Sequence, residues 1–284
     1  MTKARIDARF NALKAEGRAA FVTYVMAGDP DYATALEILQ GLPAAGADVI
    51  EVGFPFSDPM AEGPPIQRAA QRALSKGMTL NRTLELIADF RKTDQDTPVI
   101  LMGYANPLVT PGYVAFARDA AQAGVDGLIV VDIPPEEADP LADALDAEGL
   151  SLIRLATPTT DDARLSIVIQ RTSGFVYYVS VAGVTGVKEA DADLVAPHVR
   201  RVRAASGLPV AVGFGIKTPE RAAAIARVAD GVVVGSALVD EVAAALAVNE
   251  SVTARVLSKV ESLAHAVRTA RTSEPEARTL HGNG

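Results

Sequence analysis

The chain has 284 residues, of which 49% are hydrophobic, and its formal net charge is −8. The acidic balance argues against nucleic-acid binding, the apolar runs are shorter than the ~18 residues of a membrane span, and the charged N-terminus is unlike a signal peptide. The absence of cysteine excludes disulfides and thiolate chemistry, and His198, His265 and His281 lie outside acid-rich motifs, which argues against a histidine-based metal site. We therefore expect a soluble, cytoplasmic protein of one or two domains.

Helical and strand-like segments alternate along the chain. Residues 3–15 have helical spacing, with Ile6, Phe10 and Leu13 on one face. Buried strands are predicted at 19–27, around Glu51, and at 99–102, 127–131, 152–155, 175–179, 210–212 and 231–234. One helix is predicted after the turn at 28–30 and ends at about residue 42. Further helices are predicted at 65–76, 80–92, 111–122, 136–147, 160–170, 190–204, 219–227 and 250–270.

The predicted strands are continuous apolar runs rich in Val and Ile, which is typical of strands buried on both faces of a parallel sheet. Eight strand–helix units favour a single (β/α)8 TIM barrel with an extra N-terminal helix over an open doubly wound sheet. We expect the barrel to span residues 1–271 and the polar tail, 272–284, to be disordered.

A weak internal repeat brings an aspartate, Asp48, Asp126 or Asp230, to the start of a strand. Because these residues enter from the N-terminal side of the strands, we expect them to form turns and fix register at the stability face of the barrel.

Acidic residues gather in and after the strand that carries Glu51. The Gly/Pro-rich loop that follows delivers Asp58 and Glu62, and Asp132 ends a later strand. A carboxyl group among apolar walls has a raised pKa and can donate and accept a proton near neutral pH. For Asp58 and Asp132, bracing of a loop is at least as good an explanation as catalysis. Candidate walls are Phe21, Ile66, Tyr104, Tyr177 and Phe214.

Glycines follow the last two predicted strands, where barrels commonly bind phosphate through backbone N–H groups. The residues concerned are Gly213, Gly215, Gly235 and Ser236. No lysine lies inside a predicted strand, which disfavours a Schiff-base mechanism. The segment 182–186 has the composition of a mobile lid or of a plain surface loop.

Several motifs together resemble the tryptophan synthase alpha chain. The most specific is Ile-Glu-Val-Gly-Phe-Pro-Phe-Ser-Asp-Pro at 50–59, followed by Glu-Gly-Pro at 62–64. Further matching motifs lie at 28–30, 102–107, 177–180, 183–186 and 213–216, in the order of the family. The resemblance implies a (β/α)8 barrel that cleaves indole-3-glycerol phosphate to indole and glyceraldehyde 3-phosphate without its own metal or cofactor.

The resemblance also implies roles for individual residues. Glu51 would transfer protons, Glu62 would bind the indole N–H, and Tyr177 would orient the site. Thr185 would close a lid. Phe21, Ile66, Tyr104 and Phe214 would hold indole, and Gly186, Gly215, Gly235 and Ser236 would bind phosphate.

The family further implies a beta chain as partner, in an α2β2 assembly, which holds pyridoxal phosphate and receives indole through a tunnel. Pro55, Asp58, Pro59 and Asn106 would face that chain. This sequence departs from the commonest family pattern at one position, because Glu62 stands where aspartate is usual.

Three alternatives remain open from the residues. They are an isomerase or epimerase of sugar phosphates, a free-standing lyase that releases indole, and a catalytically silent regulatory subunit.

Overall fold

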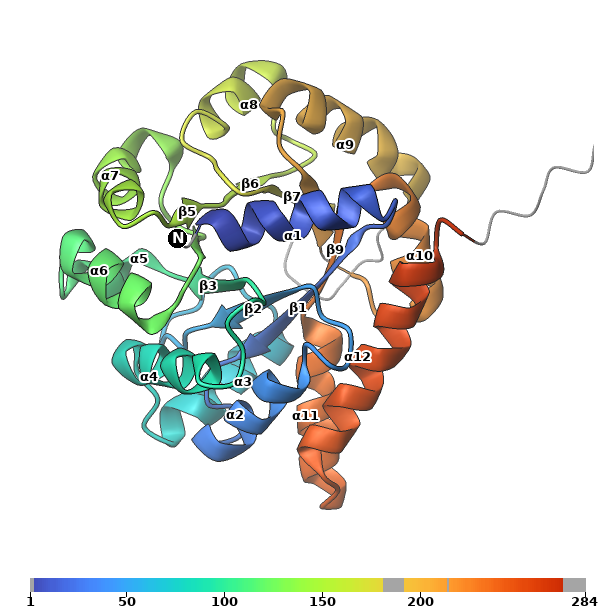
Figure 1. The fold of residues 1–284 in the computed structure, drawn as a ribbon. Helices are drawn as coiled ribbons and strands as arrows, with labels where there is room; N and C mark the ends of the chain where they lie inside the picture. The colour runs from blue at the N-terminus through green and yellow to red at the C-terminus, as the bar shows by residue number, and fades with distance from the viewer. Residues whose placement is uncertain (1–2, 181–191, 214, 273–284) are drawn as a thin grey trace, which may run out of the picture.

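The computed structural model describes residues 3–180, 192–213 and 215–272. They form a ring of parallel strands surrounded by helices, with the N-terminal helix α1 crossing one end (Figure 1). The strands are β1 (Ala20–Met26), β2 (Val49–Gly53), β3 (Val99–Gly103), β4 (Gly127–Val130), β5 (Ser151–Leu152), β6 (Arg154–Ala156), β7 (Val176–Val179), β8 (Val210–Gly213) and β9 (Gly231–Val234). The predicted (β/α)8 barrel with an extra N-terminal helix is confirmed.

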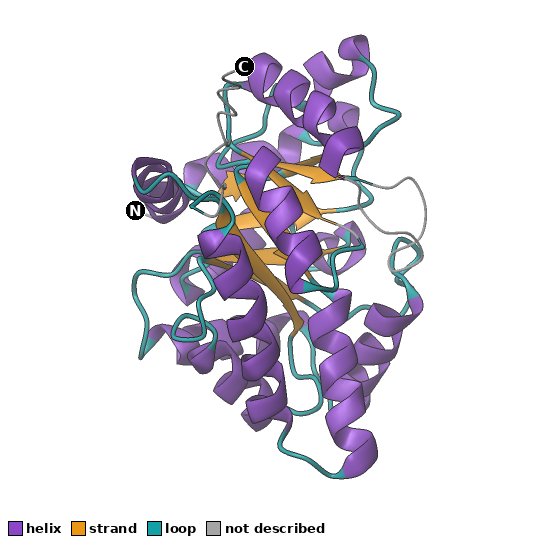
Figure 2. Cartoon of the chain, turned by 90° about the vertical axis from the view of Figure 1, so that its right-hand side faces the viewer, coloured by secondary structure: helices purple, strands orange, loops and turns teal. Residues whose placement is uncertain are grey.

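Helices follow almost every strand. They are α1 (Lys3–Ala15), α2 (Tyr32–Gly41), α3 (Pro64–Ser75), α4 (Leu80–Arg91), α5 (Ala105–Val109), α6 (Tyr113–Ala123), α7 (Asp139–Ala147), α8 (Asp162–Val168), α9 (Ala192–Ser206), α10 (Pro219–Val228), α11 (Ser236–Val248) and α12 (Val252–Thr269), with a 3-10 turn at Pro135–Glu137. Figure 2 shows the strands enclosed between helices. Within the described ranges, no helix is long and apolar enough to span a membrane.

The barrel closes through a strand that changes partner. The sheet order is β5-β4-β3-β2-β1-β9-β8-β7-β6, so its two ends are β5 and β6. These two short strands are consecutive in the chain and are separated only by Ile153. β5 pairs with β4, whereas β6 pairs with β7. The single strand predicted at 152–155 is therefore split, and the split joins the two ends of the sheet into a ring.

The repeated aspartates fix strand register, as predicted. Each carboxylate accepts a hydrogen bond from the backbone N–H of a residue at the start of the neighbouring strand: Asp48 from Phe21 at 2.9 Å, Asp126 from Val99 at 2.8 Å, and Asp230 from Val210 at 2.9 Å. In each pair the aspartate N–H donates back to the carbonyl of the same residue. Each aspartate of the repeat thus makes two hydrogen bonds that hold adjacent strands together in register.

Arginines neutralise these buried aspartates from the N-terminal end of the barrel. Asp126 is fully buried and accepts from Arg5 of α1 at 2.8 Å and from Arg91 of α4 at 2.7 Å. Asp48 is held by both terminal nitrogens of Arg18, at 2.8 and 3.0 Å. Buried charges need such partners. The ion pairs therefore tie α1 and its following loop to the strand starts.

Two helices are not predicted by the sequence pattern. α11 is apolar almost all round, with Asp240 and Glu241 as its only charged residues, so no polar face marks it as a surface helix. It packs between β1 and α12. The short helix α5 contains Pro107 within the turn after β3, a residue that favours a loop there. Thr272 continues the hydrogen bonding of α12, and 273–284 lies outside the described residues, so the predicted tail stays a prediction.

Candidate active site

Glu51 is the central residue of β2, and none of its surface is exposed. Its register partners are Tyr24 on β1 and Ile100 on β3. Neither carboxyl oxygen has a hydrogen-bond partner among the described residues. Burial disfavours the charged form and raises the pKa of Glu51 to about 8, with the charge of Glu62 as the second cause. At neutral pH the group is therefore mainly protonated and can donate a proton.

Glu62 approaches Glu51 from the loop between β2 and α3. Burial raises the pKa of its carboxyl group to about 7. The backbone of this loop is braced, because the Ala61 N–H donates to the Tyr104 hydroxyl at 3.0 Å and the Gln67 side-chain amide donates to the Glu62 carbonyl at 2.9 Å. The second carboxyl group is thus held on a fixed segment.

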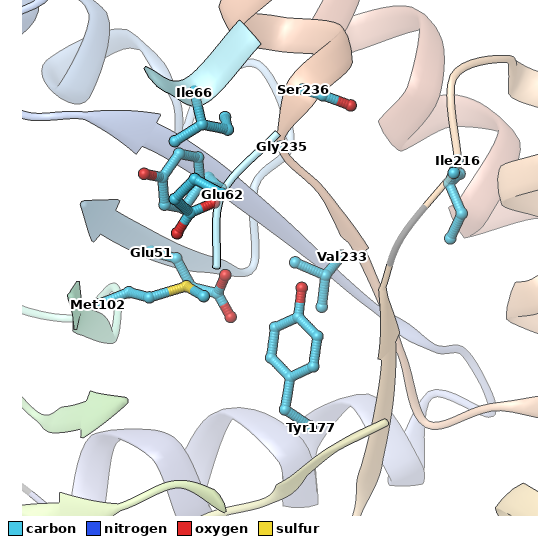
Figure 3. A pocket seen from close by; sticks show the side chains of 11 residues that line it. Glu51, Glu62, Ile66, Met102, Tyr177, Ile216, Val233, Gly235 and Ser236 are labelled. Carbon is cyan, nitrogen blue, oxygen red and sulfur yellow. The ribbon is translucent and has the colours of Figure 1, made fainter. Parts of the chain in front are cut away.

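The two glutamates line one cavity, which encloses about 460 Å³ of space including its opening. Figure 3 shows both carboxyl groups and the Tyr177 hydroxyl directed toward the same space. The predicted site residues that line the cavity are Glu51, Glu62, Ile66, Tyr177, Gly215, Gly235 and Ser236.

Other lining residues were missed, and Phe21 lies away from the cavity. Tyr24, Met102, Ile216 and Val233 line the cavity but were not predicted. Phe21 does not line it. Phe21 is the second residue of β1, at the end clamped by Asp48, and its side chain alternates away from that of Tyr24. The inward aromatic residue of β1 is therefore Tyr24, three positions later.

Tyr104 has a supporting position. It lies outside the cavity lining, is 2% exposed, and its ring centroid lies 5.3 Å from that of Phe56. Burial, with the charge of Glu62 as the second cause, raises the pKa of its phenol to about 12, so the hydroxyl stays neutral. Tyr104 therefore braces the Glu62 loop, whereas the sequence predicted an indole contact.

Gly213 leaves the space that the Tyr177 hydroxyl occupies. A Cβ atom at Gly213 would lie 2.2 Å from the Tyr177 hydroxyl oxygen, so any larger residue would displace the phenol. Gly213 itself does not line the cavity. The glycine at this position is therefore explained better by the space that Tyr177 needs than by the phosphate contact predicted for it.

We expect Gly213→Ala to lower kcat/KM roughly tenfold and to destabilise the fold by about 1–3 kcal/mol, because overpacking forces Tyr177 to shift. Gly207→Ala is the matched control. Gly207 has a positive φ of 68°, but a Cβ atom there would have no neighbour within 4 Å, so its substitution strains only the backbone. Steady-state kinetics and thermal unfolding of both variants test this; equal activity in the two variants would contradict the steric role.

The unpredicted helix α11 adds to the proposed phosphate end of the cavity. Ser236 begins this 13-residue helix, directly after Gly235. Gly215 has φ 74°, a conformation that glycine adopts readily. The first turn of a helix presents backbone N–H groups and a positive dipole end, which favour an anion. Both observations support the prediction of a phosphate site here.

The loops expected to face a partner lie beside the cavity. Asp58 and Asn106 are exposed and Pro59 is partly exposed, whereas Pro55 is buried and offers no surface to a partner. Met60, in the same loop as Asp58 and Pro59, is 77% exposed. Asp132 accepts a hydrogen bond from the Ala105 N–H at 2.8 Å and so braces α5, which carries Asn106.

Three predicted residues lie outside the described part of the chain: Thr185, Gly186 and Phe214. The proposed lid therefore stays a prediction. In the ranges that are described, no group of three or more His, Cys, Asp or Glu side chains could hold a metal ion.

Comparison with known proteins identifies the family. The model of the tryptophan synthase alpha chain family matches residues 10–268. A tryptophan synthase alpha chain of Phenylobacterium zucineum (strain HLK1) is 79% identical over 273 residues, which cover 96% of this chain and 99% of the relative. One from Caulobacter vibrioides (strain NA1000 / CB15N) is 72% identical over 271 residues, 95% of this chain and 98% of the relative.

Solved structures agree with the sequence comparison. The crystal structure of tryptophan synthase subunit alpha from Legionella pneumophila str. Paris has a TM-score of 0.87 and 42% identity, covering 93% of this chain and 98% of that one. A structure of Mycobacterium tuberculosis tryptophan synthase has a TM-score of 0.83 and 37% identity, covering 93% and 98%. This chain belongs to the tryptophan synthase alpha chain family.

Proposed function

We propose that this chain cleaves indole-3-glycerol phosphate to indole and glyceraldehyde 3-phosphate, with Glu51 and Glu62 as its reacting carboxyl groups. The observation that carries the proposal is the pair of carboxyl groups in one cavity, of which Glu51 is fully buried and without a hydrogen-bond partner among the described residues. A buried, unpaired carboxyl group is costly and is expected where it has chemistry to perform.

Glu51 can act first as acid and then as base. In its protonated form it donates a proton to C3 of the indole ring, which turns the ring nitrogen into an iminium. The resulting carboxylate then takes the proton of the glycerol hydroxyl next to C3. The bond between C3 and the glycerol carbon breaks, its electrons restore the indole ring, and an aldehyde forms on the leaving group. The raised pKa of Glu51, about 8, suits a group that must donate a proton near neutral pH.

Glu62 stabilises the charge that forms on the ring. Its carboxylate would accept a hydrogen bond from the indole N–H, which becomes more acidic as the iminium develops. A hydrogen bond that strengthens in the transition state accelerates the reaction more than one that binds the substrate alone. The braced loop around Ala61 and Gln67 supports this role, because it limits reorganisation during the reaction.

The remaining lining of the cavity fits the two ends of the substrate. Ile66, Met102, Tyr24 and Tyr177 present apolar or aromatic surface for an indole ring. Gly215, Gly235 and Ser236, at the start of α11, would bind the phosphate through the backbone. Binding the phosphate away from the breaking bond helps to orient the substrate.

The family implies a beta chain as partner. We propose an α2β2 assembly in the cytoplasm, in which the beta chain holds pyridoxal phosphate and receives indole, while this chain needs no cofactor. Asp58, Pro59 and Asn106 would contact it, together with the exposed Met60.

Indole release from indole-3-glycerol phosphate, measured with and without a tryptophan synthase beta chain, tests the function. We expect slow release by the isolated chain and at least tenfold stimulation by the partner. No release in either case would refute the lyase function. Fast release that the partner does not change would indicate a free-standing lyase, and partner activation without release would indicate a regulatory subunit. Sedimentation of the mixture tests the stoichiometry.

A further inference from the structure

The cavity contains a second tyrosine hydroxyl, that of Tyr24, to which the mechanism above gives no role. Tyr24 on β1 is the register partner of Glu51 on β2. Paired residues of adjacent strands point to the same side, so both side chains face the barrel interior. Tyr24 lines the same cavity as Glu51 and Glu62.

The position of the Tyr24 hydroxyl is defined by a glycine. A Cβ atom at Gly53 would lie 2.1 Å from the Tyr24 hydroxyl oxygen, so the phenol extends along the sheet over Gly53. Gly53 is two residues beyond Glu51 and is the last residue of β2, before the loop that carries Glu62. The ring therefore lies beside Glu51, whereas the hydroxyl lies at the end of the strand from which Glu62 approaches.

Tyr177 repeats this arrangement on the other side of the barrel. It pairs with Ala211 of β8, and its hydroxyl lies over Gly213, two residues further on. The two phenols differ in their surroundings. Burial raises the pKa of both well above its usual value, but the carboxyl charge that acts most strongly on Tyr24 is that of Glu62, and on Tyr177 that of Glu51. Of the two carboxyl groups, Glu62 thus has the larger electrostatic effect on Tyr24, and Glu51 has the larger effect on Tyr177.

We propose that the Tyr24 hydroxyl is the hydrogen-bond donor that positions the Glu62 carboxylate against the substrate. This inference rests on the proposed function. A phenol hydroxyl can donate its proton to a carboxylate, and the charge that acts most strongly on Tyr24 is that of Glu62. The charge of Glu62 acts on Glu51 of β2, Tyr24 of β1, Tyr104 after β3 and Tyr177 of β7.

A donor aimed at a carboxylate favours its charged form. Tyr24 would therefore offset part of the repulsion between two carboxyl groups that share one cavity, and keep Glu62 ionised while Glu51 remains protonated. Which of the two acids is ionised and which is protonated would then depend on Tyr24, although Tyr24 itself transfers no proton in the reaction.

Tyr24→Phe tests the proposal because it removes only the hydroxyl. We expect kcat/KM to fall roughly tenfold, the size expected for a lost hydrogen bond to a charged group. The apparent pKa of Glu62, followed by 13C NMR of glutamate carboxyl groups with Glu62→Gln for assignment, should rise, and the acidic limb of the kcat/KM profile should move to higher pH with it.

Two comparisons separate positioning from packing. Glu62→Gln keeps an amide oxygen that can accept from the indole N–H, so a residual rate is expected in this background. Tyr24→Phe should change that rate less than twofold, because residues that act through one contact are not additive. Tyr178→Phe is the matched control: Tyr178 is also a buried tyrosine, but it alternates away from the cavity and its ring stacks on His198, with centroids 5.7 Å apart. It should leave the pH profile unchanged.

An unchanged pKa of Glu62 in Tyr24→Phe would overturn the proposal, as would an equal loss of rate in both backgrounds. The NMR titration requires no turnover. It therefore decides the Tyr24–Glu62 contact even if the wild-type chain releases no indole, which would refute the proposed function separately.

Discussion

Glu51→Gln is expected to lower indole release about a thousandfold, because the loss of a general acid and base removes a group that commonly contributes 10²–10⁴ in rate. Glutamine keeps the size and planarity of the side chain but cannot donate a carboxyl proton to C3. Since wild-type Glu51 must be protonated to react, kcat/KM should also fall as pH rises through about 8, the raised pKa of this group.

The same substitution should make the protein more stable, with a definite pH dependence. The pKa of Glu51 is raised on folding, so the folded state binds more protons than the unfolded state between about 4.5 and 8, and wild-type stability falls through that window. Glutamine does not titrate. The free energy of unfolding of the variant should therefore exceed that of the wild type by a margin that grows as pH rises. The margin should reach about 2–4 kcal/mol at pH 7, from two to three pKa units at 1.36 kcal/mol each. It should level off above pH 8.

Chemical unfolding from pH 5 to 9, together with indole assays, tests both effects. Glu261→Gln is the control, because Glu261 is an exposed residue of α12 and its replacement should change neither quantity. An inactive Glu51→Gln variant whose stability advantage over the wild type is no larger at pH 8 than at pH 5 would contradict the raised pKa. One that retains normal turnover would remove Glu51 from the mechanism.

Local sequence was sufficient for the strands and for the two acids, but not for which side chains point inward. β1 reads Ala-Phe-Val-Thr-Tyr-Val-Met and all of it is buried. A strand covered on both faces has no polar alternation, so the sequence could not show that Tyr24, and not Phe21, faces the cavity. Only the register with Glu51 resolves this.

The other differences have similar physical causes. The break at Ile153 exists because one strand pairs with β4 and then with β7, a property of ring closure that no local pattern contains. α11 lacks a polar face because it is packed under α12, so its periodicity is absent from the sequence. Its first turn nevertheless lies where the glycines predicted a phosphate site, since Gly235 and Ser236 mark both the strand end and the helix start.

Removal of the second carboxyl group, by Glu62→Ala, is expected to abolish measurable lysis and leave the fold intact. The loop is fixed by the Ala61 N–H and by the Glu62 carbonyl, neither of which belongs to the carboxyl group that is removed. The melting temperature should therefore stay within a few degrees of the wild type. Glu62→Asp keeps the charge but shortens the reach by about 1.5 Å, one carbon–carbon bond, and should retain activity to within about tenfold.

A titration shows whether the two carboxyl groups act on one another. The charge of Glu62 is the second cause, after burial, of the raised pKa of Glu51. In Glu62→Ala that repulsion is lost, so the apparent pKa of Glu51 should fall while remaining above its ordinary value, because Glu51 stays buried. In Glu62→Asp it should stay close to the wild-type value. If Glu51 titrates at the same pH in the alanine variant, the two acids are not coupled, and a shared role in proton transfer would need another basis than their proximity.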